Sequence, residues 1–238
     1  LLGFLGRKGN EIIKGLPLRF VERLRERGQA THHRACPLHV SLTMVDPEGT
    51  KRLAWEIMDE NNVEVLLYVF ATDVIMEGNK CKGVIIDSKK GREVIYAKSI
   101  VDCTGDGDIL YRAGAEMKYG NDQGIPQPPT LMFSMRGVDS RKLRDAVADH
   151  PEIYDIDYIP NEFFRPMDNC TFVGFRNQIR QAREAGYHLP VERTIFMTGM
   201  AEDEWWVNMS RVNGIDATDP QQYTRGEHEC MLQNEEVV

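Results

Sequence analysis

The stretch KSIVDCTGDGDI, residues 98–109, combines small and acidic residues in an order suited to ligand binding. The apolar pair Ile100 and Val101 indicates the end of a strand, residues 104–108 predict a tight turn, and a short helix follows. Glycines let a backbone approach a ligand closely, and the first N–H groups of a helix have no partner within it. Asp106 and Asp108 add acceptors for hydroxyls such as those of ribose or ribitol. The alternative is an ordinary strand-to-helix turn of an α/β domain.

Other residues with chemical potential form weaker patterns. His32, His33, Cys36 and His39 could hold a metal, but no second cysteine pair or helical HxxxH accompanies them. A loop with an edge strand is the preferred interpretation, and we predict no metal site. The sequence has no GxSxG, HExxH or P-loop lysine motif, so the catalytic residues stay unassigned.

The composition is that of a folded, acidic protein. Of 238 residues, 42% are apolar and 28% are charged, and the net charge of −8 argues against a nucleic-acid or anionic-membrane partner. The apolar run 63–76 is interrupted by Glu64, Thr72 and Asp73, so it is too polar and too short to span a bilayer. Five scattered cysteines favour free thiols, and hence a cytoplasmic location, over a disulfide framework.

Periodicity predicts the elements that must position the 98–109 stretch. In chain order they are a helix from Pro17 to Gly28, a helix from Asp46 to Asn62, a strand at 63–67, and further strands at 72–76, 82–86 and 93–96. Asp46 can cap the second helix, and a proline suits the first position of each. We expect the second helix to pack on a parallel sheet, with the meander of strands beside it.

A proline-rich crossing at 119–129 precedes the remaining elements. These are a strand at Thr130–Arg136, helices at Ser140–His150 and Phe175–Gly186, strands at Arg193–Met200 and Glu204–Val212, and a last helix that starts at Asp219. The segment 151–169 is irregular. The three strands predict one antiparallel sheet in a separate domain.

Polar residues of the last strand and its exit are candidates for contacting a substrate. Alternation places Trp206, Asn208 and Ser210 on one face, and Trp205, Val207, Met209 and Arg211 on the other, more apolar face, which we expect to be core. Hydrogen bonding within the sheet edge is the alternative role for the polar face. The substrate candidates are Asn208, Ser210, Arg211 and Asn213, with Arg136, His188 and Arg193 as further candidates for a carboxylate.

Three segments resemble a known family. They are DPEGTKRLAWEIMDENNVEVLLYVFATDVI at 46–75, GVIIDSKKGREVIYAKSIVDCTGDGDILYRAGA at 83–115, and ERTIFMTGMAEDEWWVNMSRVNGIDATDP at 192–220. The first two are similar to the FAD-dependent oxidoreductases of the glutathione-reductase-like class, and closest to the bacterial group related to fumarate reductase flavoprotein subunits. The third resembles the substrate-side sheet of that group and the return to its flavin domain.

The resemblance implies FAD as the cofactor and flavin-mediated hydride or electron transfer to or from a small metabolite. It implies that the backbone of Val69 and Phe70 faces the adenine, although their side chains also suit core packing. Thr104, Gly105 and Asp106 would lie along the adenosine and pyrophosphate, and Asp108 would either join them or cap the short helix.

The resemblance also implies a division of this α/β (mixed α+β) chain. A partial FAD-binding, Rossmann-like domain with an antiparallel meander would cover 1–120. A substrate-side domain with an antiparallel sheet would cover 121–212, and 213–238 would begin the return to the FAD domain.

The glycine fingerprint GxGxxG that opens such flavin domains is absent, and the third flavin motif would lie beyond residue 238. We therefore expect a fragment of a flavoprotein that, alone, holds FAD weakly and is inactive. A non-catalytic assembly or binding module is the alternative. The sequence does not decide whether the protein forms a homo-oligomer. The antiparallel meander argues against a third reading, a nicotinamide-dependent dehydrogenase.

Overall fold

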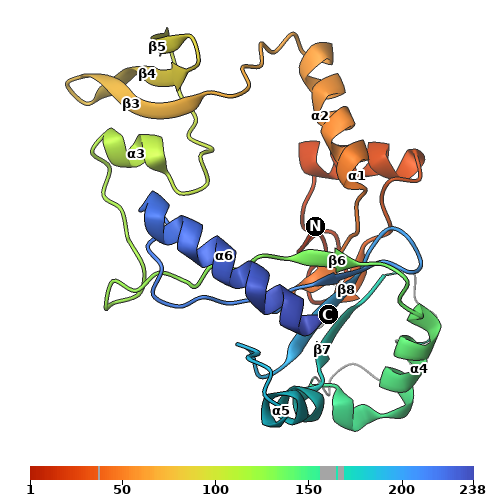
Figure 1. The fold of residues 1–238 in the computed structure, drawn as a ribbon. Helices are drawn as coiled ribbons and strands as arrows, with labels where there is room; N and C mark the ends of the chain where they lie inside the picture. The colour runs from red at the N-terminus through yellow and green to blue at the C-terminus, as the bar shows by residue number, and fades with distance from the viewer. Residues whose placement is uncertain (37, 156–164, 166–168) are drawn as a thin grey trace. The chain divides into compact units, whose positions relative to one another are not determined.

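The computed structural model describes residues 1–36, 38–155, 165 and 169–238, which form helices and antiparallel sheets (Figure 1). The chain divides into two compact units: Leu1–Ile57 with Pro126–Val238, and Met58–Ile125. The mixed α/β class predicted from the sequence is confirmed. These two units are defined by contacts within the structure, whereas the domains expected from the family resemblance are defined by function. The functional division at 120 and 212 therefore stays a prediction.

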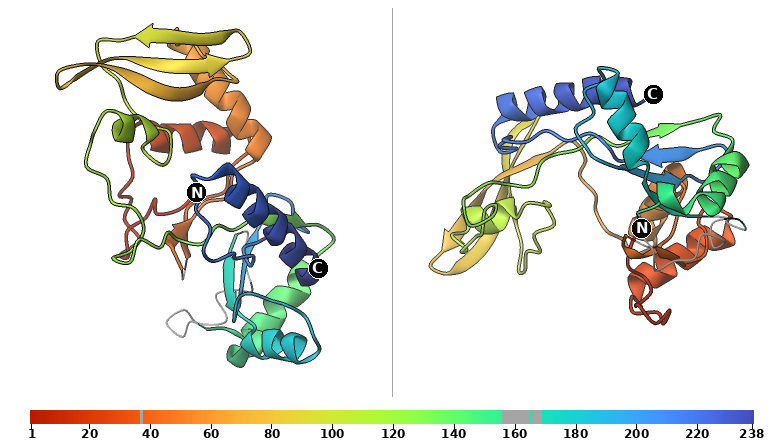
Figure 2. Two further views of the ribbon diagram at one scale, coloured as in Figure 1. Left: turned by 60° about the vertical axis from the view of Figure 1, so that its left-hand side comes forward. Right: turned by 90° about the horizontal axis from the view of Figure 1, so that it is seen from below.

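The smaller unit, Met58–Ile125, is built on an antiparallel meander. Its elements are β3 (Phe70–Glu77), β4 (Lys80–Ser88), β5 (Gly91–Tyr96) and the short helix α3 (Asp108–Arg112). β4 lies between β3 and β5, as the left view of Figure 2 shows, and α3 lies against β3. The turn between β4 and β5 uses Gly91 at φ 115°, a conformation that side chains with a Cβ rarely adopt. The predicted meander is confirmed.

Two predicted strands of this unit are wrong. Residues 63–67 and 100–101 have no strand conformation, and Val101 is 84% exposed. A strand requires a hydrogen-bonded neighbour, and no described strand pairs with either segment. The expected parallel sheet is wrong for the same reason, because every strand pair among the described residues is antiparallel.

The larger unit begins with two packed helices beside a two-stranded sheet. Its first elements are α1 (Leu16–Glu26), β1 (Arg34–Cys36), β2 (Val40–Leu42) and α2 (Pro47–Glu60); the last three residues of α2 belong to the smaller unit. Leu24 of α1 and Leu53 of α2 are fully buried in one apolar cluster, so α2 packs on α1 and not on a parallel sheet. The Asp46 carboxylate accepts a hydrogen bond from the Gly49 N–H, which confirms the predicted cap.

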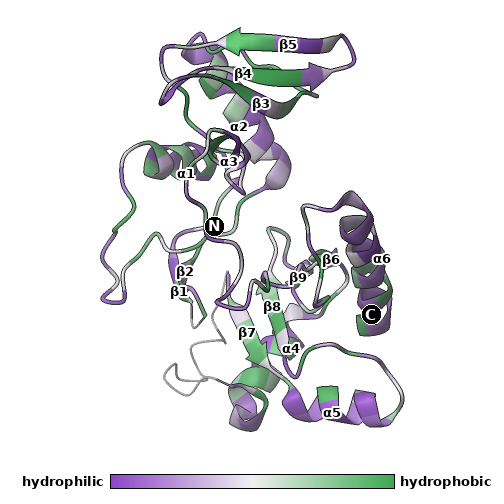
Figure 3. Ribbon diagram, turned by 90° about the vertical axis from the view of Figure 1, so that its left-hand side faces the viewer, coloured by the Kyte–Doolittle hydropathy of each residue, from purple (hydrophilic) through white to green (hydrophobic). Residues whose placement is uncertain are grey.

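A four-stranded antiparallel sheet forms the rest of the larger unit. Its strands are β6 (Phe133–Met135), β7 (Thr171–Gly174), β8 (Thr194–Thr198) and β9 (Trp205–Val207), and they lie in the order β6-β9-β8-β7. The helical elements of this part of the unit are α4 (Ser140–Asp149), the 3₁₀ turn η1 (Pro151–Ile153), α5 (Arg176–Glu184) and α6 (Pro220–Val237). The predicted sheet of three strands is confirmed. β7 was not predicted, because all four of its residues are buried and no alternation marks them. Figure 3 shows β7 and β8 as hydrophobic and α5 as largely hydrophilic.

Alternation along β9 has the predicted polarity as far as Met209. Trp205, Val207 and Met209 are buried, with exposed fractions of 1%, 0% and 2%. Trp206 and Asn208, on the other face, are half-buried. The apolar face is therefore core up to Met209. Beyond it the prediction is wrong, because Arg211 is exposed and Ser210 of the polar face is 3% exposed.

Two further predictions concern the chain as a whole. Most of the segment 151–169, predicted to be irregular, lies outside the described residues. In the part of the chain that the structure describes, none of the helices combines the length and the apolar character that crossing a membrane requires.

Candidate functional site

The turn 102–108 is held in place by the carboxylate of Asp102. Oδ1 accepts hydrogen bonds from the Thr104 N–H (2.9 Å) and the Thr104 hydroxyl (2.7 Å), and Oδ2 accepts one from the Leu110 N–H (2.9 Å). The Thr104 hydroxyl also accepts a hydrogen bond from the Asp108 N–H at 2.9 Å. These contacts hold the pKa of Asp102 below its ordinary value, with the Thr104 hydroxyl as the largest cause. One carboxylate therefore ties both sides of the turn together.

Two glycines give this turn its shape. Gly105 has φ 91° and Gly107 has φ 77°, both in the left-handed region. A Cβ built at Gly105 would meet nothing within 4 Å, so the space in front of this residue is open. Within the described residues, the N–H groups of Gly105, Asp106 and Gly107 have no hydrogen-bond acceptor. The turn therefore presents an open backbone to its surroundings.

The helix start does not contribute as expected. The N–H groups of Asp108 and Leu110 are taken by the Thr104 hydroxyl and the Asp102 carboxylate. The expectation that free N–H groups of this helix would face a ligand is therefore wrong for these two donors. Donors free for a ligand come instead from residues 105–107, and acceptors come from the exposed carboxylates of Asp106 and Asp108.

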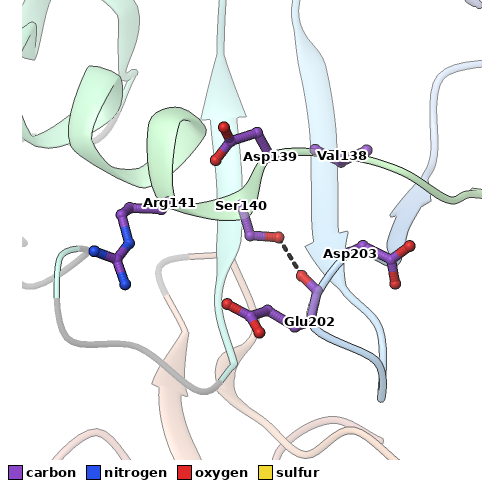
Figure 4. A pocket seen from close by; sticks show the side chains of 6 residues that line it. All are labelled: Val138, Asp139, Ser140, Arg141, Glu202 and Asp203. Carbon is purple, nitrogen blue, oxygen red and sulfur yellow. Dashed lines mark hydrogen bonds between the residues drawn. The ribbon is translucent and has the colours of Figure 1, made fainter.

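A shallow hollow of about 550 Å³ lies in the larger unit, at the start of α4. Figure 4 shows its lining residues, Val138, Asp139, Ser140, Arg141, Glu202 and Asp203. Its polar groups are largely engaged by the protein itself: the Ser140 hydroxyl donates to the Glu202 C=O, and the Asp139 carboxylate accepts from the Lys142 N–H at 3.0 Å. Because of these contacts, we interpret the hollow as part of the cap of α4. Its lining shows no evident catalytic group.

The histidine and cysteine residues near β1 have structural contacts. His33 stacks on Phe4 with ring centroids 4.4 Å apart, and its Nδ1 contacts the Thr43 hydroxyl. Cys36 Sγ lies 3.7 Å from His39 Nδ1. No group of three or more His, Cys, Asp or Glu side chains in the described part of the chain is placed to bind a metal.

Comparison with protein families gives the class of this chain. The profile of the family described as FAD dependent oxidoreductase matches residues 1–238. The chain belongs to the FAD-dependent oxidoreductase family. Its members bind FAD and have FAD-linked redox roles, which confirms the cofactor expected from the sequence. No curated protein and no solved structure matches the chain.

The turn of this FAD-dependent oxidoreductase fits a hydroxyl-bearing part of FAD. The exposed carboxylates of Asp106 and Asp108 have no partner among the described residues, and they can accept hydrogen bonds from ribose or ribitol hydroxyls. The free N–H groups of residues 105–107 can donate to oxygens of the same ligand. Residues 99–111 contribute three carboxylates and no lysine or arginine, so the turn offers no cation to a pyrophosphate.

The predicted adenine-facing residues lie at the start of β3. Phe70 pairs with Asp87 of β4, and its side chain is 79% exposed, so it is not part of a core. Val69 is half-buried, and the preceding Tyr68 is 94% exposed with φ 58°. The contact of Val69 and Phe70 with adenine stays a prediction.

Two of the substrate candidates on the polar face of β9 and its exit take part in the sheet edge. Ser210 is 3% exposed; its hydroxyl accepts from the Leu131 N–H (2.9 Å) and donates to the Leu131 C=O (3.0 Å). The Asn208 side-chain oxygen accepts a hydrogen bond from the Thr130 hydroxyl at 3.2 Å. These contacts correspond to the alternative role expected from the sequence, while substrate binding by either residue stays a prediction.

The cationic candidates differ in how far the protein already uses them. Arg136 lies 3.5 Å from Asp203, Arg193 lies 3.4 Å from Asp155, and His188 lies 3.4 Å from Glu236. The exposed guanidinium of Arg211 has no ionic or hydrogen-bonded partner among the described residues, and its backbone is held by the side chain of Gln233. Asn213, two residues further on, is also exposed.

Sequence reasoning missed Asp102, although it named residues on both sides of it. The signal that could have found it is the spacing Asp102-Cys103-Thr104, because an aspartate often hydrogen-bonds the backbone two residues later. The longer contact from Asp102 to Leu110 has no comparable signal in the sequence.

Proposed function

We propose that this chain is part of an FAD-dependent oxidoreductase that transfers a hydride or electrons between the flavin and a small metabolite. When bound, FAD supplies the redox chemistry through its flavin ring, and the protein supplies binding, orientation and electrostatics. The proposal rests mainly on the turn 102–108, which combines an open glycine backbone with two carboxylates that have no partner in the part of the chain that the structure describes. The family assignment makes FAD the ligand to test there.

Each part of the turn has a distinct task in this proposal. The backbone of Gly105 approaches the ligand because no Cβ stands in front of it. The carboxylates of Asp106 and Asp108 accept hydrogen bonds from ligand hydroxyls. A hydroxyl is uncharged, so the negative charge of the two carboxylates does not repel it. The turn thus binds a ribose or ribitol portion of FAD, and positive charge for the pyrophosphate comes from elsewhere in the protein.

The substitution Gly105→Val tests this function in the protein as its gene encodes it. We expect the variant to retain little FAD after purification, because a branched side chain occupies the approach to the turn. The matched control is Gly91→Val, which places the same side chain at another left-handed glycine with open space in front of it, in the β4–β5 turn. Flavin absorbance per chain measures retention, and far-UV circular dichroism measures folding.

Comparison of the two variants separates ligand loss from backbone strain. Both substitutions force a β-branched residue into a left-handed conformation and destabilise the local turn. Flavin loss restricted to Gly105→Val supports the proposal. Normal flavin content in a folded Gly105→Val protein, or equal loss in both variants, overturns the assignment of this turn.

On the substrate side, we propose Arg211 as the group that binds a carboxylate of the metabolite. Its guanidinium has no protein partner among the described residues, whereas Arg136 and Arg193 are paired with carboxylates. A free guanidinium can form two parallel hydrogen bonds with a carboxylate.

A panel of small carboxylic acids, mixed anaerobically with the flavin-loaded protein, tests the assignment by bleaching of the flavin colour. We expect Arg211→Gln to raise the concentration of acid needed for half-bleaching by about tenfold or more. Arg180→Gln, at an exposed arginine of α5, is the control and should respond as the wild type. An acid that bleaches both variants equally well would exclude Arg211.

A further inference from the structure

The side chain of Asp102 connects the two sides of the proposed FAD-binding turn. It reaches forward two residues to the N–H and hydroxyl of Thr104, and eight residues to the N–H of Leu110. We propose that Asp102 is a positioning residue, which fixes the turn 104–108 in its ligand-binding shape before FAD arrives. This inference rests on the proposed function, because it assigns the turn's ligand as FAD.

The chemistry of the turn explains why it needs such a residue. Gly105 and Gly107 both have left-handed conformations, and glycine has more backbone conformations available than any other residue. A flexible turn would lose this freedom on binding, and that loss lowers affinity. By holding Thr104 on one side and Leu110 on the other, Asp102 restricts the turn in the unliganded protein, so less freedom is lost when the ligand binds.

Thr104 is the second part of the same device. Its hydroxyl donates its single proton in a hydrogen bond of 2.7 Å to the Asp102 carboxylate. The same hydroxyl accepts a hydrogen bond of 2.9 Å from the Asp108 N–H. The hydroxyl therefore has no proton left to donate to a ligand. Its contact with Asp108 orients the start of α3, so Thr104 supports the turn from within while residues 105–107 face outward.

The chain contains a second turn with the same local pattern, which provides an internal control. The Asp216 carboxylate accepts the Thr218 N–H at 2.9 Å and the Thr218 hydroxyl at 2.7 Å. This turn belongs to the larger unit and precedes α6, whose first turn is capped separately by Asp219. Substitution of Asp216 therefore reports the general cost of losing an aspartate turn in this protein.

The experiment uses the flavin-binding protein as its gene encodes it, after removal of FAD, and titrates FAD back by quenching of flavin fluorescence. We expect Asp102→Ala to raise the Kd for FAD by about tenfold or more. Asp102→Asn should lie between, because it keeps an oxygen for Thr104 but loses the acceptor for Leu110. Thr104→Ser should bind as the wild type, and Thr104→Val should resemble Asp102→Ala.

Two further measurements separate positioning from general stability. Amide hydrogen exchange in the protein without FAD should become faster at Thr104, Asp108 and Leu110 in Asp102→Ala. The Asp102→Ala and Asp216→Ala variants should have the same thermal midpoint of unfolding. The Asp216→Ala variant should nevertheless keep the wild-type Kd for FAD. A wild-type Kd in Asp102→Ala, or an equal rise in Kd in Asp216→Ala, overturns the positioning role.

The outcome also distinguishes this inference from the proposed function. If Gly105→Val loses FAD while Asp102→Ala binds it normally, the turn binds FAD and Asp102 does not position it. If Gly105→Val binds FAD normally, the turn is not the FAD contact, and both the function assigned to it and the role of Asp102 fail. Loss of FAD binding in both variants, together with wild-type binding in Thr104→Ser and weakened binding in Thr104→Val, supports both.

Discussion

The indole N–H of Trp205 donates a 2.7 Å hydrogen bond to the hydroxyl of Ser140, the first residue of α4. That hydroxyl in turn donates to the backbone C=O of Glu202, in the loop that leads into β9. Trp205 is 1% exposed and stacks on Phe172 of β7, with ring centroids 5.0 Å apart. Ser140 thus connects the helix, the loop and the sheet of the larger unit within its core.

Replacing Ser140 by alanine should destabilise the protein by about 1–3 kcal/mol, because the buried indole N–H loses its acceptor. Chemical denaturation followed by tryptophan fluorescence measures the change. Ser134→Ala is the matched control, since Ser134 lies in β6 of the same sheet with an exposed side chain. Equal stability of Ser140→Ala and Ser134→Ala would show that the indole finds another acceptor.

The cysteines should differ strongly in reactivity toward a maleimide. Cys103 is exposed, whereas Cys170 is 3% exposed and burial raises its pKa to about 12. The thiolate is the reactive form, so Cys170 should react only after unfolding. Mass spectrometry of native and urea-unfolded protein identifies the labelled residues. Cys103→Ser should remove the fast phase of labelling, and rapid labelling of Cys170 in the native protein would contradict its burial.

The raised pKa of Cys170 also predicts how stability depends on pH. Above the ordinary thiol value of 9.0, the unfolded thiol loses its proton while the folded thiol keeps it up to about 12. The folded state then binds more protons than the unfolded state, so the free energy of unfolding falls as pH rises through this window. The full shift corresponds to a loss on the order of 4 kcal/mol. Denaturation at a series of pH values should show a shallower fall in Cys170→Ser than in Cys103→Ser.

The sequence predicts those elements that depend on nearby residues. The meander of β3, β4 and β5 follows from alternation and from turn residues, and the buried face of Trp205 and Val207 follows from a two-residue period. Residues 63–67 have the same kind of alternation without forming a strand. Whether such a segment becomes a strand depends on a neighbouring strand, which the local pattern does not specify.

Prediction of the candidate site had the same limit. Gly105, Asp106 and Asp108 could be named because small and acidic residues in a turn suggest ligand binding. The role of Asp102 depends on its contact with Leu110, eight positions away. In this contact the carboxylate accepts a hydrogen bond from an N–H group of the first turn of α3 that would otherwise have no acceptor. These contacts follow from the three-dimensional path of the turn, so the sequence pattern alone placed the free donors at the helix start instead of at residues 105–107.

Arg183 of α5 provides the last prediction, because its guanidinium holds the loop after the helix. Nε and Nη2 donate to the Leu189 C=O at 3.0 Å and 2.8 Å, and Nη2 also donates to the Val191 C=O at 2.9 Å. Arg183→Met keeps much of the side-chain length but removes these charged donors, so we expect a loss of about 1–3 kcal/mol in urea denaturation. Arg183→Lys should recover only part of this, since one ammonium does not reproduce the planar fork. On the same helix, Arg180 lies 4.0 Å from Glu184 and is exposed, and Arg180→Met should change stability by less than about 0.5 kcal/mol. Equal effects at the two positions would mean that loss of positive charge on α5, and not the contact with the loop, determines stability.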